Sequence, residues 1–159
     1  MDNENPMESH PGIAVQNSLS GFNCAQAVFC AFEDVHGLEP TYAYCLSSSF
    51  GGGLGWLRET CGALSGALMV LGLLEGSYPP GDAEAKAEHY RKIQKLAAEF
   101  EEEIGAKKCW QILGLPEGPT EPVPVYHKPG QGPRPVCLHC VRYAAELIDR
   151  RLREKGMLE

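Results

Sequence analysis

Hydrophobic residues recur at every third or fourth position between residues 82 and 104, which is the spacing of an amphipathic helix. Asp82 follows a Pro-Pro-Gly turn as an N-cap, and Gly105 ends the pattern. Charged residues occupy the opposite face, which we expect to be a solvated surface rather than an acidic docking site. The pattern therefore predicts a helix over residues 82–104, whose buried face consists of Tyr90, Ile93, Ala97, Phe100 and Ile104.

Shorter patterns predict three further helices. Asn23 and Gln26 have the spacing of a capping box, so a helix should run over residues 23–35. A short helix is expected over residues 41–48. The last helix should run over residues 137–152, and one side of it carries Cys137, Cys140, Val141, Ala144, Ile148 and Leu152.

The longest apolar run covers residues 61–74, which is too short for a membrane span of about 20 residues. We interpret it as a buried core helix. Its first turns contain Gly62 and Gly66, and each glycine costs a helix about 1 kcal/mol relative to alanine. Small residues allow either another helix or a bulky inorganic group to approach the backbone, and the spacing leaves both alternatives open.

Two loops are rich in glycine or proline. The run FGGGLGW over residues 50–56 lacks the preceding strand and the Lys-Ser/Thr of a phosphate-binding loop. It is therefore expected to be a turn, or a place where the backbone approaches a buried group closely. The segment 115–135 lies between Cys109 and Cys137. It either folds over what those cysteines hold or is a surface insertion, and the sequence favours neither alternative.

These patterns define the fold class. Strand signals are nearly absent, and 159 residues suffice for one domain with a substantial core. We expect an all-α, single-domain helical bundle of about five to seven helices, with a long Pro/Gly-rich loop before the last helix. The domain should cover residues 1–159, with residues 1–10 and 155–159 frayed.

The amino-acid composition indicates which kinds of partner and which cellular compartment to expect. A formal charge of −7 and a pI of about 5.2 argue against nucleic acid or an anionic membrane surface as a partner. The first residues lack the basic and apolar regions of a signal peptide, which favours a cytoplasmic location. In a reducing compartment, seven cysteines indicate metal binding, redox chemistry or burial rather than structural disulfides.

Four of the seven cysteines lie where a helix or helical turn is expected to begin: Cys24, Cys61, Cys109 and Cys137. Backbone N–H groups and the positive end of the helix dipole favour thiolate over thiol there. Cys24 and Cys137 also share helix faces with core residues, so their sulfurs should point inward. The other three cysteines, Cys30, Cys45 and Cys140, are expected to be small buried hydrophobic residues.

Common cysteine motifs lack their context in this chain. Cys137 and Cys140 form a C-x-x-C, but the βαβ pattern of a thioredoxin is missing. Position 141 is valine, where a c-type haem motif needs histidine. A zinc ribbon needs a second close pair. A four-cysteine site from separate segments remains, and it suits an iron–sulfur cluster as well as zinc.

Cys24, the segment CGALSG over residues 61–66, Cys109 and Cys137 resemble the C_GCAxxG_C_C family of redox-active proteins. The likeness covers roughly residues 15–150, including the glycine-rich run and the spacing of Val141 and Ala144 after Cys137. The sequence is also similar to part of the split-Soret cytochromes, in which a cluster accompanies haem. The resemblance implies a redox function and assigns Cys24, Cys61, Cys109 and Cys137 as the motif cysteines.

The leading hypothesis is a protein that binds an iron–sulfur cluster, of the [2Fe–2S] type, through Cys24, Cys61, Cys109 and Cys137. Its role would be electron transfer or redox sensing with a redox partner protein, while enzymatic activity is left open. Gly62, Ala63 and Gly66 would leave room for inorganic sulfide. We expect the four cysteines to converge near one end of the helix over residues 61–74.

Two alternatives remain at this stage. One is a cluster-free thiol–disulfide oxidoreductase that uses Cys137 with Cys140, or Cys24 with Cys61. The other is a structural zinc-binding module with the same four motif cysteines. His127 and His139 could contribute hydrogen bonds to the site, although His139 is expected to face solvent. A homodimer is a further expectation, because an apolar surface next to a cluster needs cover.

Overall fold

The computed structural model describes residues 8–120 and 132–159, and within these ranges the fold is all-α. Seven helices have five residues or more, as the sequence predicted, and the isolated bridge between Thr60 and Lys108 is the one β contact described. The elements are α1 (His10–Leu19), α2 (Cys24–Phe29), η1 (Cys30–Phe32), α3 (Glu33–His36), α4 (Pro40–Ser47), η2 (Ser48–Phe50), α5 (Gly51–Leu54), α6 (Gly62–Glu75), α7 (Ala83–Ile104), α8 (Cys109–Leu113) and α9 (Pro135–Glu154).

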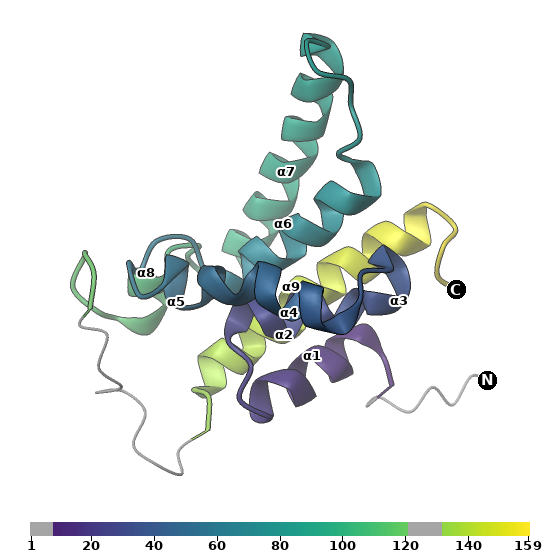
Figure 1. Ribbon diagram of the computed structural model, residues 1–159. Helices are drawn as coiled ribbons and strands as arrows, with labels where there is room; N and C mark the ends of the chain where they lie inside the picture. The colour runs from purple at the N-terminus through teal and green to yellow at the C-terminus, as the bar shows by residue number, and fades with distance from the viewer. Residues whose placement is uncertain (1–7, 121–131) are drawn as a thin grey trace.

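Helices α2, α6 and α9 form the centre of the molecule, and α1 packs on α2 and α9. Helix α7 projects away from this body beside the second half of α6, while α5 and α8 lie together at another side (Figure 1). None of the helices in the described residues combines the length and the apolar character that a bilayer crossing requires.

Small residues at the start of α6 bring α2 into close contact. A Cβ atom at Gly66 would lie 2.7 Å from the carbonyl oxygen of Ala25, and one at Gly62 would lie 3.1 Å from the Ala25 nitrogen. Such distances leave no room for a side chain at either position. For these two glycines the structure therefore confirms the helix-packing alternative, and the packing sets Cys24 beside the N-terminus of α6.

Several sequence predictions hold at the level of single residues. Asn23 and Gln26 form the predicted capping box of α2. The Asp82 side chain accepts a hydrogen bond from the Ala85 N–H at the start of α7, and Gly105 ends that helix in the left-handed conformation. These signals lie within a few residues of each other, which explains why the sequence alone reveals them.

Other predictions are wrong in detail. The helix expected over residues 23–35 is broken, because Phe32 leaves helical geometry with φ −108° and ψ 26°. The intervening 3-10 turn allows both Phe29 and Phe32 to be fully buried. Tyr90, which the pattern predicts on the buried face of α7, is exposed, since the face that meets the core carries Leu96 and Phe100. Helix α1 was not predicted at all.

The loop predicted over residues 115–135 is described only in part. Residues 115–120 and 132–134 are outside helices, and α9 begins at Pro135. Residues 121–131, which include the candidate His127, lie outside the described residues. The prediction that the loop covers the cysteines, and the alternative of a surface insertion, both stay predictions.

Candidate functional site

Five of the seven cysteines line one cavity with a volume of about 150 Å³. They are Cys24, Cys61, Cys109, Cys137 and Cys140. The sequence reasoning placed the first four of them near helix starts, and the structure brings all four to the N-terminal end of α6. Apolar side chains of Phe22, Trp56, Ile112 and Leu113 complete much of the wall, and two arginines, Arg58 and Arg134, also line it.

The cavity lies where four helices begin. Cys24 is the first residue of α2 and Cys109 the first of α8. Cys61 is the N-cap of α6, and Cys137 lies in the first turn of α9. The longer helices α6 and α9 therefore direct the positive ends of their dipoles towards the sulfurs, which favours negative charge in the cavity.

A short backbone pairing holds Cys61 next to Cys109. The Cys61 N–H donates to the Lys107 carbonyl at 2.8 Å, and the Cys109 N–H donates to the Glu59 carbonyl at 2.6 Å. Together with the bridge between Thr60 and Lys108, these bonds align two segments far apart in the chain. These backbone hydrogen bonds alone fix the position of Cys61 relative to Cys109.

The glycine-rich run is an unusual turn over the cavity. Gly53 has φ 64°, and a Cβ atom there would lie 2.7 Å from the Cβ of Cys109. This close approach to a buried group confirms the prediction for residues 50–56. Leu54, Trp56 and Arg58 also have positive φ values, of 68°, 66° and 62°. Non-glycine residues adopt this conformation only where the surroundings compensate its cost, and such residues cluster at functional sites.

Cys24 and Cys137 form one pair of interacting thiols. The hydrogen bond from Cys24 lowers the pKa of Cys137 to about 7, and the nearby charges of Arg134 and Arg58 act in the same direction. The pKa of Cys24 is raised by the same hydrogen bond, by burial and by the neighbouring cysteines. Cys137 is therefore the member of this pair that carries the negative charge near neutral pH.

Cys61 and Cys140 form a second pair. The hydrogen bond from Cys140 lowers the pKa of Cys61 despite its burial, and the N–H groups of Ala63 and Leu64 at the start of α6 contribute. The pKa of Cys140 is raised well above its ordinary value, first by this hydrogen bond and then by burial. The sequence predicted Cys24 with Cys61 and Cys137 with Cys140 as candidate pairs, but the contacts join Cys24 to Cys137 and Cys61 to Cys140.

Cys140 is the cysteine whose role was misjudged from the sequence. We expected it to be a packing residue, and it is indeed buried at 1% exposure, but it lines the cavity and contacts Cys61. Its position three residues after Cys137 places both on one face of α9, which was the available signal. Cys30 is buried and does not line the cavity, as predicted, whereas Cys45 is exposed, so its predicted burial is wrong.

Arg58 is the site residue that the sequence analysis missed. The residue is buried at 7% exposure, and its guanidinium donates from Nη1 to the Cys109 sulfur at 3.5 Å and from Nε to the Thr120 hydroxyl at 3.0 Å. Burial raises the pKa of Cys109, and the hydrogen bond and charge of Arg58 partly offset that rise. No local pattern marks an arginine three residues before Cys61 as functional.

The remaining candidate within the described residues, His139, lies apart from the cavity. His139 is exposed, and its Nε2 lies 3.4 Å from a Glu103 carboxylate oxygen, as expected for a solvent-facing residue. In residues 8–120 and 132–159, no three His, Cys, Asp or Glu side chains are arranged to hold a metal ion together. This finding supports neither a zinc ion nor an iron–sulfur cluster in particular.

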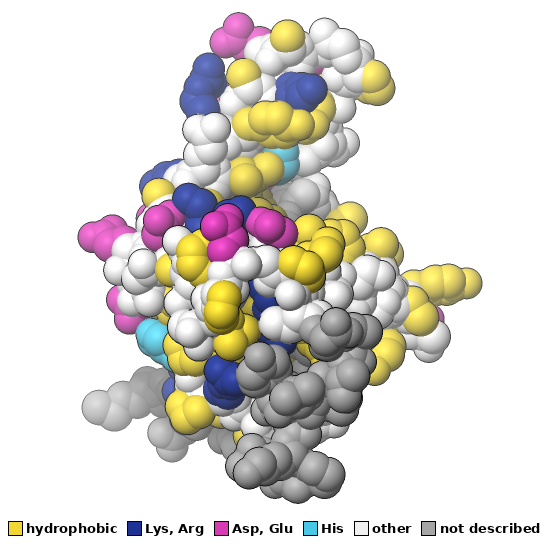
Figure 2. Space-filling model, turned by 90° about the vertical axis from the view of Figure 1, so that its left-hand side faces the viewer, with side chains coloured by type: hydrophobic (Ala, Val, Ile, Leu, Met, Phe, Trp, Pro, Cys, Tyr) yellow, Lys and Arg dark blue, Asp and Glu magenta, His cyan; other side chains and the backbone are white. Residues whose placement is uncertain are grey.

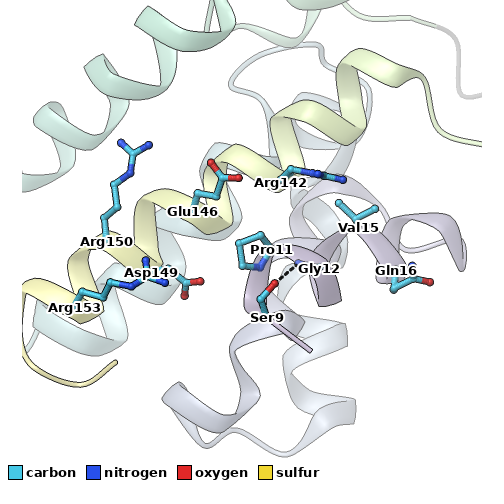
Figure 3. A pocket seen from close by; sticks show the side chains of 10 residues that line it. All are labelled: Ser9, Pro11, Gly12, Val15, Gln16, Arg142, Glu146, Asp149, Arg150 and Arg153. Atoms are coloured by element: carbon cyan, nitrogen blue, oxygen red, sulfur yellow. Dashed lines mark hydrogen bonds between the residues drawn. The ribbon is translucent and has the colours of Figure 1, made fainter. Parts of the chain in front are cut away.

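A second, larger cavity of about 560 Å³ lies between α1 and α9 (Figure 3). Arg142, Glu146 and Arg150 of α9 line it opposite Ser9 and Gly12 of α1. Arg142 and Arg150 are exposed, and the Ser9 hydroxyl already accepts the Gly12 N–H as a helix cap. This groove contains no cysteine, so the thiol chemistry belongs to the smaller cavity.

Comparison with known proteins gives one match. The model of the family described as "Putative redox-active protein (C_GCAxxG_C_C)" matches residues 22–151. The matched range contains all five cysteines of the cavity as well as Arg58. No curated protein and no solved structure matches the chain.

Proposed function

The chain belongs to the "Putative redox-active protein (C_GCAxxG_C_C)" family, and on this premise we propose that the cysteine cavity is its redox centre. We further propose that the centre is an iron–sulfur cluster of the [2Fe–2S] type, held by Cys24, Cys61, Cys109 and Cys137. The cluster would exchange single electrons for electron transfer or redox sensing.

The observation that carries this proposal is the convergence of five cysteines on one cavity, four of them from four helix starts. A [2Fe–2S] cluster takes only two cysteines on each iron. It therefore needs two pairs of thiolates rather than three ligands around one ion. The contact between Cys24 and Cys137, and the backbone pairing that sets Cys61 beside Cys109, supply two such pairs.

The surroundings suit a negatively charged group. Cysteines that ligate a metal are thiolates and carry negative charge. Positive charge surrounds the sulfurs here, from Arg58, Arg134 and the N-termini of α6 and α9. Trp56 and Phe22 would limit access of water. The thiol of Cys140 would then donate a hydrogen bond to the Cys61 sulfur, which is one of the means by which proteins adjust cluster potentials.

A protein partner suits the surface beside the cavity. Leu54 is 37% exposed and Leu57 is 50% exposed, on either side of the cavity residue Trp56. Figure 2 looks onto this side of the molecule and shows exposed hydrophobic side chains next to basic ones. An apolar rim of this kind is typical of a docking site for another protein.

A second candidate is thiol–disulfide exchange, which the low pKa of Cys137 and its contact with Cys24 favour. The Cys137 thiolate would attack a disulfide of a partner protein, forming a mixed disulfide and releasing one partner thiolate. The Cys24 sulfur would then attack Cys137, giving up its proton to the second partner sulfur as that sulfur leaves. The partner gains two electrons, and this chain becomes oxidised to a Cys24–Cys137 disulfide.

Anaerobic purification followed by analysis of iron, zinc and acid-labile sulfide separates the candidates. The cluster proposal expects brown protein with about two irons and two sulfides per chain. Serine variants of each motif cysteine should lose this colour, whereas Cys45→Ser and Cys30→Ser should keep it because those residues lie outside the cavity. Colourless, metal-free protein that loses two thiols on mild oxidation would contradict the cluster and favour the dithiol.

A further inference from the structure

Arg58 is held in one place at the edge of the cavity by both its backbone and its side chain. It sits in the left-handed conformation with φ 62° and is 7% exposed. Its two described side-chain bonds run to Cys109 at 3.5 Å and to Thr120 at 3.0 Å. The backbone on both sides is also held, because the Arg58 N–H donates to Gly52 and its carbonyl accepts from Trp110.

These contacts fix the direction of the guanidinium. Thr120 is itself anchored, since its N–H donates to the Trp56 carbonyl at 3.0 Å. The Nε donor is therefore committed to Thr120, and Nη1 is directed at the Cys109 sulfur. The guanidinium therefore holds its positive charge within hydrogen-bond distance of a cysteine sulfur in the cavity.

We propose that Arg58 is a positioning residue that sets the reduction potential of the cysteine centre through its fixed positive charge beside Cys109. The inference rests on the proposed redox function of the cavity. It does not depend on which redox group the cysteines form. In either case reduction adds negative charge to the sulfurs: one electron for a cluster, or thiolate in place of neutral disulfide.

The sign of the effect follows from Coulomb's law. A buried positive charge stabilises the reduced, more negative state more than the oxidised state, and therefore raises the reduction potential. Removing it should make the centre harder to reduce. Because the guanidinium is largely shielded from solvent, salt should screen this effect only weakly.

The test compares Arg58→Gln with Arg58→Lys and with Arg142→Gln in the full chain. Arg142 is an exposed arginine of α9 in the second cavity, so its variant makes the same change in net charge away from the cysteines (Figure 3). We expect Arg58→Gln to shift the reduction equilibrium at least tenfold towards the oxidised form. This corresponds to about 59 mV for a one-electron couple or about 30 mV for a two-electron couple.

The controls make each outcome informative. Arg142→Gln should leave the reduction potential unchanged. Arg58→Lys should keep the reduction potential close to the wild-type value, because it retains the positive charge although it lacks the planar guanidinium. Circular dichroism establishes that each variant is folded, and Arg58→Lys gives the second measurement should Arg58→Gln unfold. An unchanged potential in folded Arg58→Gln, or an equal shift in Arg142→Gln, would overturn the inference. A wild-type protein without any reversible redox transition would instead overturn the proposed function.

Discussion

The two ends of helix α9 differ in how their polar groups are partnered. At its start, Cys137 and Cys140 contact other thiols across a cavity, beside a turn with several positive φ values. Near its end, Asp149 and Arg151 meet groups of opposite charge from α1 and α6. The same helix thus joins a strained, reactive region to a region whose contacts hold the fold together.

The contacts at the far end of α9 are ionic, and each has a buried side chain at its centre, either His10 with Asp149 or Glu75. His10 is hydrogen-bonded between Asp149 at 2.6 Å and Asp34 at 2.9 Å, and so links α1, α3 and α9. The Glu75 side chain, 3% exposed, meets both Arg151 and Lys155 at the end of α6. Removing one member of such a group leaves buried charge without compensation, so this end should carry most of the sensitivity of folding to mutation.

The largest effect is expected from Asp149→Ala. It leaves His10 facing only Asp34, and the loss of a buried partner should lower the free energy of unfolding by about 3 kcal/mol. Urea denaturation gives this value. Glu146→Ala, a half-buried position on the same helix, should cost less than about 0.5 kcal/mol. Equal losses in the two variants would contradict the assignment of this end as the stabilising one.

The next largest effect should come from Gly66→Ala, which tests how α2 is held against α6. The new Cβ would meet the Ala25 carbonyl at 2.7 Å, so overpacking should cost about 2 kcal/mol and displace Cys24. Gly72→Ala in the same helix has nothing within 4 Å and should stabilise by about 0.5 to 1 kcal/mol. Thermal unfolding of both variants measures the difference, and the same sign for both would contradict the packing model.

Gly53→Ala should disturb the cavity more than the fold. The substitution adds left-handed strain of about 1 to 2 kcal/mol and a contact of 2.7 Å with Cys109. Gly55→Ala has a similar φ of 59°, but its nearest contact is 4.0 Å away. Both variants should therefore lose stability to the strain, and Gly53→Ala should lose more because its Cβ also overlaps neighbouring atoms. Only Gly53→Ala should alter the redox centre, as read from its spectrum or reduction potential. A normal centre in Gly53→Ala would show that this close approach does not position Cys109.

The same contrast explains what the sequence could and could not predict. Local patterns reveal features that depend on neighbouring residues. These are the capping box of α2, the span of α7 and the helix-start positions of the motif cysteines. The position of Arg58 against Cys109 depends on the pairing of Thr60 with Lys108, and the contact of Cys140 with Cys61 depends on the packing of α9 against α6. The pairing of Thr60 with Lys108 joins distant segments and leaves no periodic signal. The sequence therefore predicted which cysteines form the site. It did not predict how these cysteines pair or that Arg58 lies beside Cys109.

The smallest expected effect is a pH dependence that belongs to the stabilising end. Burial lowers the pKa of His10, but hydrogen bonds and charges of Asp149 and Asp34 outweigh burial and raise it above the ordinary 6.5. The stability that protonated His10 contributes is therefore complete below 6.5 and is lost as pH rises through the higher pKa of the folded state. Urea denaturation across this window should show that the stability difference between the wild type and His10→Asn shrinks as pH rises, because the titration of other groups such as Cys137 is common to both proteins. The difference between the wild type and His139→Asn, whose side chain is exposed, should show no such change. A difference between the wild type and His10→Asn that grows with pH would contradict the bridge between the two aspartates.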